Sequence, residues 1–166
     1  SFLLQKFMTQ DGLYQAHVLL FASLTVPLKW SEDATALICK AEDKGRQHVW
    51  RFDIAKQQPT VVAEGGTVHA FDEAAGQLVT LMDKSVHPGR IQVTQVDESG
   101  RSVSSASKRI EHFNDDLLKG IVLGRTEEHW FKGAKGDDVQ VWLHYPPGFH
   151  QTKKYPLLHT IHGGPH

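Results

Sequence analysis

The last residues of the chain have the types and spacing best suited to chemistry. An apolar run over 157–161 is followed directly by His162, Gly163, Gly164 and Pro165. Two adjacent glycines behind a hydrophobic strand can present backbone N–H groups to a ligand, because glycine lacks a Cβ and adopts positive φ without strain. Donors of this kind stabilise an oxygen that becomes negatively charged during a reaction. The spacing therefore marks this loop as a candidate edge of an active site.

Metal and phosphate chemistry fit the same stretch less well. His159, His162 and His166 cluster there, but two histidines four residues apart bind zinc from a helix, and Gly163-Gly164-Pro165 prevents a regular helix. No cysteine or acidic third ligand follows them, and no Gly-Lys-Ser or Gly-Lys-Thr follows the glycines as in a phosphate-binding loop. We therefore expect no metal and no cofactor.

Other reactive residue types have simpler structural interpretations. Asp115-Asp116 and Asp137-Asp138 are carboxylate pairs in loop sequences, and we expect solvated turns there instead of an acid–base dyad. The single cysteine, Cys39, lies in the apolar stretch 36–39 and is expected to be a small buried core residue. One cysteine also means that no internal disulfide can form.

The composition is that of a globular chain. The 166 residues carry a net charge of −1 with the histidines neutral, 40% are hydrophobic and 22% are charged. No basic surplus points to nucleic acid. The longest apolar run, 17–26, is shorter than the ~20 residues of a membrane helix and is interpreted as a core strand, so no membrane partner is expected. The compartment stays open between cytoplasm and periplasm, because the chain starts at Ser1 and the natural protein is expected to begin further upstream.

The middle of the chain is typical of antiparallel β structure, because turn residues recur about every 8–12 positions between short strand-like segments. In one segment Trp50, Phe52 and Ile54 alternate with Arg51 and Asp53, which is the period of two of a half-buried strand. Strands are predicted over 35–41, 48–54, 60–64, 67–72, 77–83 and 90–97.

A weak internal repeat indicates how these strands are grouped. Trp30 and Phe71 lie 41 residues apart, and each precedes an acidic turn, an apolar strand, a charged turn and a second strand that ends in Asp. Propeller blades of four strands repeat at about 40–50 residues, so 26–66 and 67–112 are predicted to be two blades. A piece of a generic β-sandwich is the alternative. Two blades cannot close a ring of about four to eight, so the natural protein is expected to extend further toward the N-terminus.

The character of the chain changes after these blades. Residues 113–127 resemble a connector, and Gly136-Asp137-Asp138 is a hairpin-type turn. A strand is predicted over 139–144, where apolar residues alternate with others. The nearly continuous apolar run over 157–161 predicts a central strand covered on both faces.

The last part of the chain carries a family likeness. Residues 131–166 contain a Lys-Gly…Gly-x-x-Val strand pair, then Tyr-Pro-Pro-Gly-Phe, Lys-Lys-Tyr-Pro and His-Gly-Gly-Pro. This combination resembles the start of the catalytic domain in the prolyl oligopeptidase family of serine peptidases, and most of all its acylaminoacyl-peptidase and dipeptidyl-peptidase-like branch. Residues 29–53 are similar to the last propeller blades of that family. The likeness runs from about Val26 to His166, and residues 1–25 are left without an interpretation.

The resemblance implies a mainly β fold. It comprises two C-terminal blades of a β-propeller over 26–112, a connector over 113–127, and the first strands of an α/β-hydrolase domain over 128–166. In such a domain one oxyanion N–H comes from a His-Gly-Gly type loop after the third strand. The resemblance assigns that N–H to Gly164. It gives supporting roles to Gly163, His162 and Pro165.

The other catalytic residues that the resemblance implies are absent from this sequence. An α/β-hydrolase has a Gly-x-Ser-x-Gly elbow, followed by an acid and then a histidine. No Gly-x-Ser-x-Gly occurs, and the partial look-alike at 100–104 lacks the second glycine. The nucleophile is therefore expected beyond His166, and the chain alone is expected to be inactive.

The implied function is hydrolysis of short peptides by acyl transfer through a Ser-Asp-His triad, under a propeller that limits substrate size. Short peptides are the expected partners, and a homo-oligomer of the full-length protein stays open. Two alternatives remain: a non-catalytic β-propeller binding module, and a related α/β-hydrolase esterase.

Overall fold

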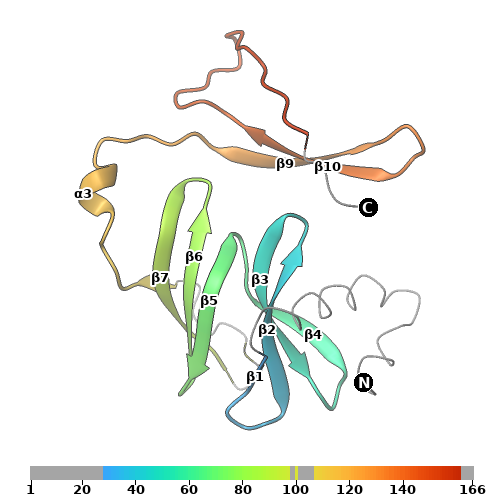
Figure 1. Ribbon diagram of the computed structural model, residues 1–166, viewed down its shortest axis with the longest axis vertical. Helices are drawn as coiled ribbons and strands as arrows, with labels where there is room; N and C mark the ends of the chain where they lie inside the picture. Colours follow the sequence, from blue (N-terminus) through green and yellow to red (C-terminus); the bar gives the residue numbers. More distant parts are fainter. Residues whose placement is uncertain (1–27, 98–99, 101–106, 162–166) are drawn as a thin grey trace. The chain divides into compact units, whose positions relative to one another are not determined.

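The computed structural model describes residues 28–97, 100 and 107–161 (Figure 1). Nearly all of the regular structure in this part is β-strand, with one short helix, α3 (Asp115–Leu118). The mainly β class expected from the sequence is confirmed. Within the described ranges, no helix has the length and apolar character that crossing a bilayer requires. The chain divides into two compact units, one up to Ile121 and one from Val122 onward.

The first unit contains two antiparallel meanders of four strands. The first meander comprises β1 (Lys29–Trp30), β2 (Ala36–Asp43), β3 (Arg46–Asp53) and β4 (Gln58–Ala63). The second meander comprises β5 (Thr67–Ala74), β6 (Gln77–Lys84), β7 (His87–Gln95) and β8 (Lys108–Arg109). A parallel pair between Gln47 and Thr67 joins β3 to β5. Each of the six strands predicted between 35 and 97 forms, with ends shifted by a few residues.

The internal repeat is visible in the positions of the strands. β2 and β6 begin 41 residues apart, and so do β3 and β7. This is the spacing between Trp30 and Phe71. The repeat thus corresponds to the two meanders, which follow each other along the chain within the first unit.

Two hairpin turns have the chemistry that antiparallel strands need. Lys44 and Gly45 join β2 to β3 with φ angles of 50° and 70°, and Ala75 and Gly76 join β5 to β6 with the same two values. Positive φ at both central residues gives a turn whose twist matches that of the flanking strands. Glycine is favoured there because it has no Cβ to strain.

Both meanders contribute to the core of the first unit. Ile38 and Val49 of the first meander belong to the same buried cluster as Val68, Leu78 and Met82 of the second. Burial of each such side chain contributes about 1.5–3 kcal/mol relative to its exposure to water. The shared cluster therefore couples the two meanders.

Strand β3 differs from the half-buried strand that the sequence predicts. Both of its faces are covered, and Arg51, expected on the outer face, is only 5% exposed. The prediction of an outward-facing Arg51 is wrong because Glu73 and Asp33 lie beside its guanidinium. A charged side chain can be buried when it is paired.

The second unit contains a β-hairpin followed by an irregular stretch. β9 (Thr126–Lys132) and β10 (Asp138–His144) pair in antiparallel fashion, with Val139 opposite Phe131. The strand predicted over 139–144 therefore forms. The hairpin turn ahead of it contains Gly136, with a φ of 84°.

The strand predicted over 157–161 does not form. The backbone there is irregular, and Leu157 and Leu158 are 83% and 89% exposed. A strand satisfies its backbone N–H and C=O groups by pairing with a neighbour, and none of the described residues pairs with this segment. An apolar sequence alone is therefore insufficient to make a central strand.

Candidate functional site

The residues predicted to form the oxyanion loop, His162, Gly163, Gly164 and Pro165, lie outside the described residues. Their roles stay predictions. The structure describes the chain as far as Ile161, and hence the stretch that leads into this loop. The contacts that hold that stretch are the nearest described part of the candidate site.

An aromatic column, made of Tyr145, Phe149 and Tyr155, holds the stretch that follows β10. The ring centroids of Tyr145 and Phe149 are 4.5 Å apart, and those of Phe149 and Tyr155 are 5.0 Å apart. The guanidinium carbon of Arg125 lies 4.1 Å from the ring centroid of Tyr145 and 5.9 Å from that of Phe149. Aromatic pairs and cation–π contacts of this kind contribute about 0.5–1.5 kcal/mol each. The column is thus a continuous set of stabilising contacts.

Charges and hydrogen bonds hold the base of the column. The hydroxyl of Tyr145 donates to Oε2 of Glu127 at 2.7 Å, and Arg125 forms an ion pair with the same carboxylate. His129 Nε2 also lies 3.3 Å from Oε2. The hydrogen bond from Tyr145 is the main cause that lowers the pKa of Glu127, and the same bond raises the pKa of Tyr145. At neutral pH Glu127 is therefore an ionised acceptor and Tyr145 a hydroxyl donor.

Local hydrogen bonds fold the loop that ends at Tyr155 back on itself. The N–H of Phe149 donates to the carbonyl of Pro146 at 3.1 Å, and the N–H of Lys153 donates to the carbonyl of His150 at 3.0 Å. The N–H of His150 donates to the hydroxyl of Tyr155 at 3.0 Å. Tyr155 therefore closes the loop with both its ring and its hydroxyl.

A glycine allows the backbone to enter the hairpin close to this column. A Cβ placed on Gly124 would lie 1.7 Å from the carbonyl oxygen of Tyr145, which is far closer than real atoms approach. The N–H of Tyr145 donates to the carbonyl of Arg125 at 2.9 Å. Only glycine permits this close passage of two backbone segments.

The residue pattern alone does not predict the aromatic column. The sequence feature that could have indicated it is the presence of aromatic residues on both sides of Pro146-Pro147-Gly148. A turn brings its flanking residues together, so such residues are candidates for contact. Which rings meet depends on the path of the whole loop.

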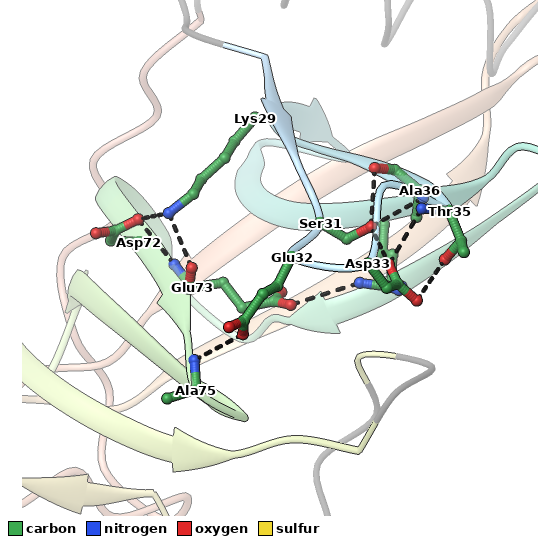
Figure 2. Close-up of polar contacts among 10 residues, drawn as sticks. Lys29, Ser31, Glu32, Asp33, Thr35, Ala36, Asp72, Glu73 and Ala75 are labelled. Carbon is green, nitrogen blue, oxygen red and sulfur yellow. Dashed lines mark hydrogen bonds and ion pairs between the residues drawn. The ribbon is translucent and has the colours of Figure 1, made fainter.

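A second polar cluster, the junction network, joins the two meanders (Figure 2). Nη1 of Arg51 lies 3.4 Å from Oε1 of Glu73, and Nη2 lies 3.7 Å from Oδ1 of Asp33. Figure 2 shows that Lys29 reaches toward Asp72 and Glu73, pairing with Asp72 and donating to the carbonyl of Glu73 at 2.8 Å. The network therefore links the start of the first meander and β3 to β5.

Two carboxylates beside Arg51 have pKa values shifted in opposite directions. The hydroxyls of Ser31 and Thr35 donate to Asp33 at 2.6 and 2.7 Å, and these hydrogen bonds lower the pKa of Asp33 to about 2. Burial raises the pKa of Glu73, and the charge of Arg51 opposes that shift. Hydrogen bonding is the main cause of the pKa shift of the exposed Asp33, and desolvation is the main cause of the shift of the buried Glu73.

The junction network has the chemistry of a structural link. Its ionised groups pair with one another, and the hydroxyls of Ser31 and Thr35 donate to Asp33, whose pKa of about 2 makes it a weak base. Across the described part of the chain, no group of three His, Cys, Asp or Glu side chains is placed to hold a metal ion.

The solvated turn predicted at Asp115-Asp116 is wrong, because these residues form the first turn of α3 and Asp115 pairs with Arg109 at 2.6 Å and with His112 at 2.8 Å. Asp137 is exposed in the hairpin turn as expected, and Asp138 is exposed at the start of β10. Cys39 is 1% exposed, and burial raises the pKa of its thiol to about 11. The prediction of a buried core cysteine is confirmed, since a nucleophilic thiol needs exposure and a lowered pKa.

Comparison with known proteins finds relatives along most of the chain. Dipeptidyl-peptidase 5 from Aspergillus fumigatus is 30% identical over 143 residues, which cover 83% of this chain and 19% of that protein. Dipeptidyl-peptidase 5 from Trichophyton tonsurans is 30% identical over 142 residues, again with 83% and 19% coverage. The chain thus spans about a fifth of the length of the curated relatives it matches. No family model matches it.

Solved structures of peptidases share the fold. An acylaminoacyl peptidase from Pyrococcus horikoshii matches with a TM-score of 0.54 at 13% identity, over 73% of this chain and 17% of that one. The AtxE2 isopeptidase matches with a TM-score of 0.58 at 16% identity, over 79% of this chain and 20% of that one. The chain is a homologue of dipeptidyl-peptidase 5 and shares its fold with part of acylaminoacyl peptidase, which confirms its resemblance to the prolyl oligopeptidase family of serine peptidases.

Proposed function

We propose that this chain is part of a serine peptidase that hydrolyses short peptides. The observation that carries the proposal is the similarity to dipeptidyl-peptidase 5 over 143 residues. The His-Gly-Gly-Pro sequence at 162–165 adds a motif of the expected chemistry. The whole protein would release dipeptides or acylated residues from the N-termini of its substrates.

On this proposal the two meanders are the last blades of a β-propeller over 26–112. Residues 113–127 connect the propeller to an α/β-hydrolase domain, of which 128–166 is the first part. The boundary between the two compact units, after Ile121, falls inside this connector and supports the division.

Gly164 would donate its backbone N–H to the oxyanion of the tetrahedral intermediate. Gly163, His162 and Pro165 would support the loop. One such donor stabilises the transition state by about 3–4 kcal/mol. The nucleophilic serine, the acid, the base and the second donor would follow His166, so the chain by itself would not turn over substrate.

The first test is the reading frame beyond His166. A Gly-x-Ser-x-Gly motif within about the next hundred residues would be the nucleophile elbow of an α/β-hydrolase. A stop codon directly after His166 would contradict the peptidase proposal and favour a non-catalytic propeller that binds a partner.

The second test is activity of the protein translated from that whole frame. Dipeptide and acyl-amino-acid nitroanilides are the peptide-like substrates, and a nitrophenyl ester tests the esterase alternative. Gly164→Pro removes the proposed N–H donor and is expected to reduce kcat by about 10²–10³-fold. Gly164→Ala keeps the N–H and measures the effect of loop shape alone.

The matched control is Gly136→Asn in the exposed hairpin turn, where φ is 84° and asparagine is tolerated. Wild-type kcat in this variant and a large loss in Gly164→Pro would support the oxyanion role. A similar kcat in Gly164→Pro and the wild type would contradict it. Hydrolysis of the ester without hydrolysis of either nitroanilide would favour an esterase.

A further inference from the structure

We infer that His48 is an acid-sensitive switch: when its ring takes up a second proton, the face of the first meander that buries it opens. The inference concerns the first unit alone and does not depend on the proposed peptidase function. It starts from the position of His48 on β3, where the side chain is only 6% exposed. Histidine is the side chain whose charge changes near neutral pH, so its burial makes this part of the fold sensitive to acid.

The surroundings of His48 are largely apolar. Strands β2 and β3 lie side by side (Figure 1), with Ala41 opposite His48 and Cys39 opposite Trp50. Because side chains alternate between the two faces of a strand, these four residues share one face, which we call the histidine face. Cys39 and Ala41 are 1% and 3% exposed, and Trp50 packs against them. The histidine face is separate from the buried cluster that the two meanders share.

The ring of His48 is buried without a hydrogen-bond partner. Neither Nδ1 nor Nε2 has one in the described part of the chain, and the same holds for Nε1 of Trp50. The nearest described ring is that of Trp50, with 6.3 Å between centroids. A neutral imidazole has one donor and one acceptor to satisfy, whereas an imidazolium has two donors and a charge. An unpaired buried charge costs far more than an unpaired buried neutral group, so the histidine face tolerates only the neutral ring.

The charged groups near His48 do not remove this penalty. Asp43 at the end of β2 and Glu64 after β4 favour the protonated ring, whereas Arg46 at the start of β3 disfavours it. Neither carboxylate accepts a hydrogen bond from the ring. The thiol of Cys39, with a pKa of about 11, stays neutral and adds no charge. Desolvation by burial is therefore the main influence, and it lowers the pKa of His48.

The direction of the pH response follows from the burial of the ring. In the open chain the pKa of His48 takes the ordinary value of about 6.5. Between that value and the lower folded value, the open form binds more protons than the closed form. The closed form therefore keeps its full stability above about pH 6.5 and loses stability as the pH falls. If the ring stays neutral in the closed form, the ratio of open to closed chains rises up to about 30-fold from pH 7.5 to pH 5.

Cys39 can report this opening, because it lies on the histidine face and is buried. The 166-residue chain is labelled at pH 7.5 and at pH 5 with a pyridyl disulfide, which reacts with thiols at both pH values. Each rate is divided by the rate in guanidinium chloride at the same pH, so that the quotient measures the open fraction. A quotient near one at pH 7.5 would mean that the face is already open, and would overturn the inference.

Two substitutions separate the charge of the ring from its polarity. His48→Gln removes the titration and keeps polar groups, and His48→Leu removes both. From pH 7.5 to pH 5, the quotient should rise about 5–30-fold more in the wild type than in either variant. The matched control is His69→Gln on β5, which removes a half-exposed histidine paired with Asp83 at 3.1 Å. This control should keep the wild-type response.

Equal rises in the wild type and both His48 variants would overturn the inference, and so would loss of the response in His69→Gln. A second readout needs no folded variant. The ring Cε1–Hε1 NMR signal of His48 in the folded wild type should keep the position of the neutral form as the pH is lowered through 6.5. A titration of this signal with a midpoint at or above about 6.5, the value of an ordinary histidine, would also overturn the inference.

Discussion

Arg51 on β3 and Glu73 on β5 form an ion pair across the junction of the two meanders, with 3.4 Å between Nη1 and Oε1. Their side chains are only 6% and 12% exposed. When one partner of a buried pair is removed, the other is left as an uncompensated charge. The pair therefore ties the second meander to the first beside their shared core.

Replacing Arg51 with methionine is expected to lower the free energy of unfolding of the first unit by about 3 kcal/mol, since Glu73 would remain buried without its partner. Urea unfolding followed by the methyl NMR signals of Ile38 and Leu78 measures this change. The control Lys56→Met removes an exposed ion pair with Asp53 and should change the value by less than about 1 kcal/mol. Equal effects of the two substitutions would contradict a larger contribution of the buried pair to the free energy of unfolding.

The stabilising effect of Asp33 is expected to disappear in acid. Its pKa is lowered to about 2 in the folded chain by hydrogen bonds from Ser31 and Thr35. A carboxyl group whose pKa is lowered by folding stabilises the fold at pH values above its unfolded pKa of about 3.9. This stabilisation is lost as the pH falls through the folded pKa. Asp33→Asn should therefore be less stable than the wild type at pH 7, and the difference should shrink as the pH falls from about 5 to 2. The exposed Asp137→Asn serves as control, and a difference independent of pH would refute the explanation.

Glu73 is expected to show the opposite dependence on pH. Burial raises its pKa, so its contribution to stability is present below the unfolded value and is lost as the pH rises through the folded value. The advantage of the wild type over Glu73→Gln should therefore decrease as the pH rises above the unfolded value of about 4.3. Unfolding measured at several pH values in both proteins provides the slope. An advantage that grows with pH would mean that the charge of Arg51 outweighs desolvation at this site.

Two glycine substitutions are expected to destabilise different units. A Cβ on Gly66 would lie 2.2 Å from the carbonyl oxygen of Asp83 in the first unit, and one on Gly124 would lie 1.7 Å from that of Tyr145 in the second. Each change to alanine should destabilise its own unit by about 1–3 kcal/mol. Residue-resolved amide hydrogen exchange would show accelerated exchange in one unit and unchanged exchange in the other.

The control for both glycines is Gly89→Ala, whose Cβ would meet the side chain of Leu81 at 3.2 Å. A side chain can shift where a backbone carbonyl cannot, so exchange should change little. Accelerated exchange in both units from either Gly66→Ala or Gly124→Ala would show that the two units unfold as one.

Cys39 is expected to resist thiol reagents while the chain is folded. Its side chain is buried, and burial raises the pKa of the thiol to about 11, so little thiolate is present at pH 8. Modification at pH 8 should be at least about 100-fold slower in buffer than in guanidinium chloride, because reaction requires the fold to open. Equal rates in the two solutions would place the thiol at the surface.

Much of the first unit could be predicted because its determinants act over short stretches. Turns such as Lys44-Gly45 and Ala75-Gly76 lie between apolar runs, and the spacing of 41 residues groups these runs into two similar sets. The alternation of apolar residues with others also predicted the strand over 139–144. In each case the signal lies within a few residues of the element that it determines.

The same kind of signal failed where a partner distant in sequence decided the outcome. Arg51 was expected on the outer face of its strand, but Glu73 on another strand and Asp33 in a loop allow it to be buried. The apolar run over 157–161 predicted a central strand, but strand pairing needs a neighbour that no described residue supplies. The candidate oxyanion residues stay a prediction from the motif and the family likeness.

The sequence by itself determined the β class, the strands and turns of the two meanders, and the likeness to a peptidase family. These features depend on residue type and local spacing. Only the tertiary structure decided that Arg51 pairs with Glu73, that no described residue pairs with 157–161, and that the rings of Tyr145, Phe149 and Tyr155 pack against one another. Such contacts depend on how strands and loops meet in space, which local spacing does not specify.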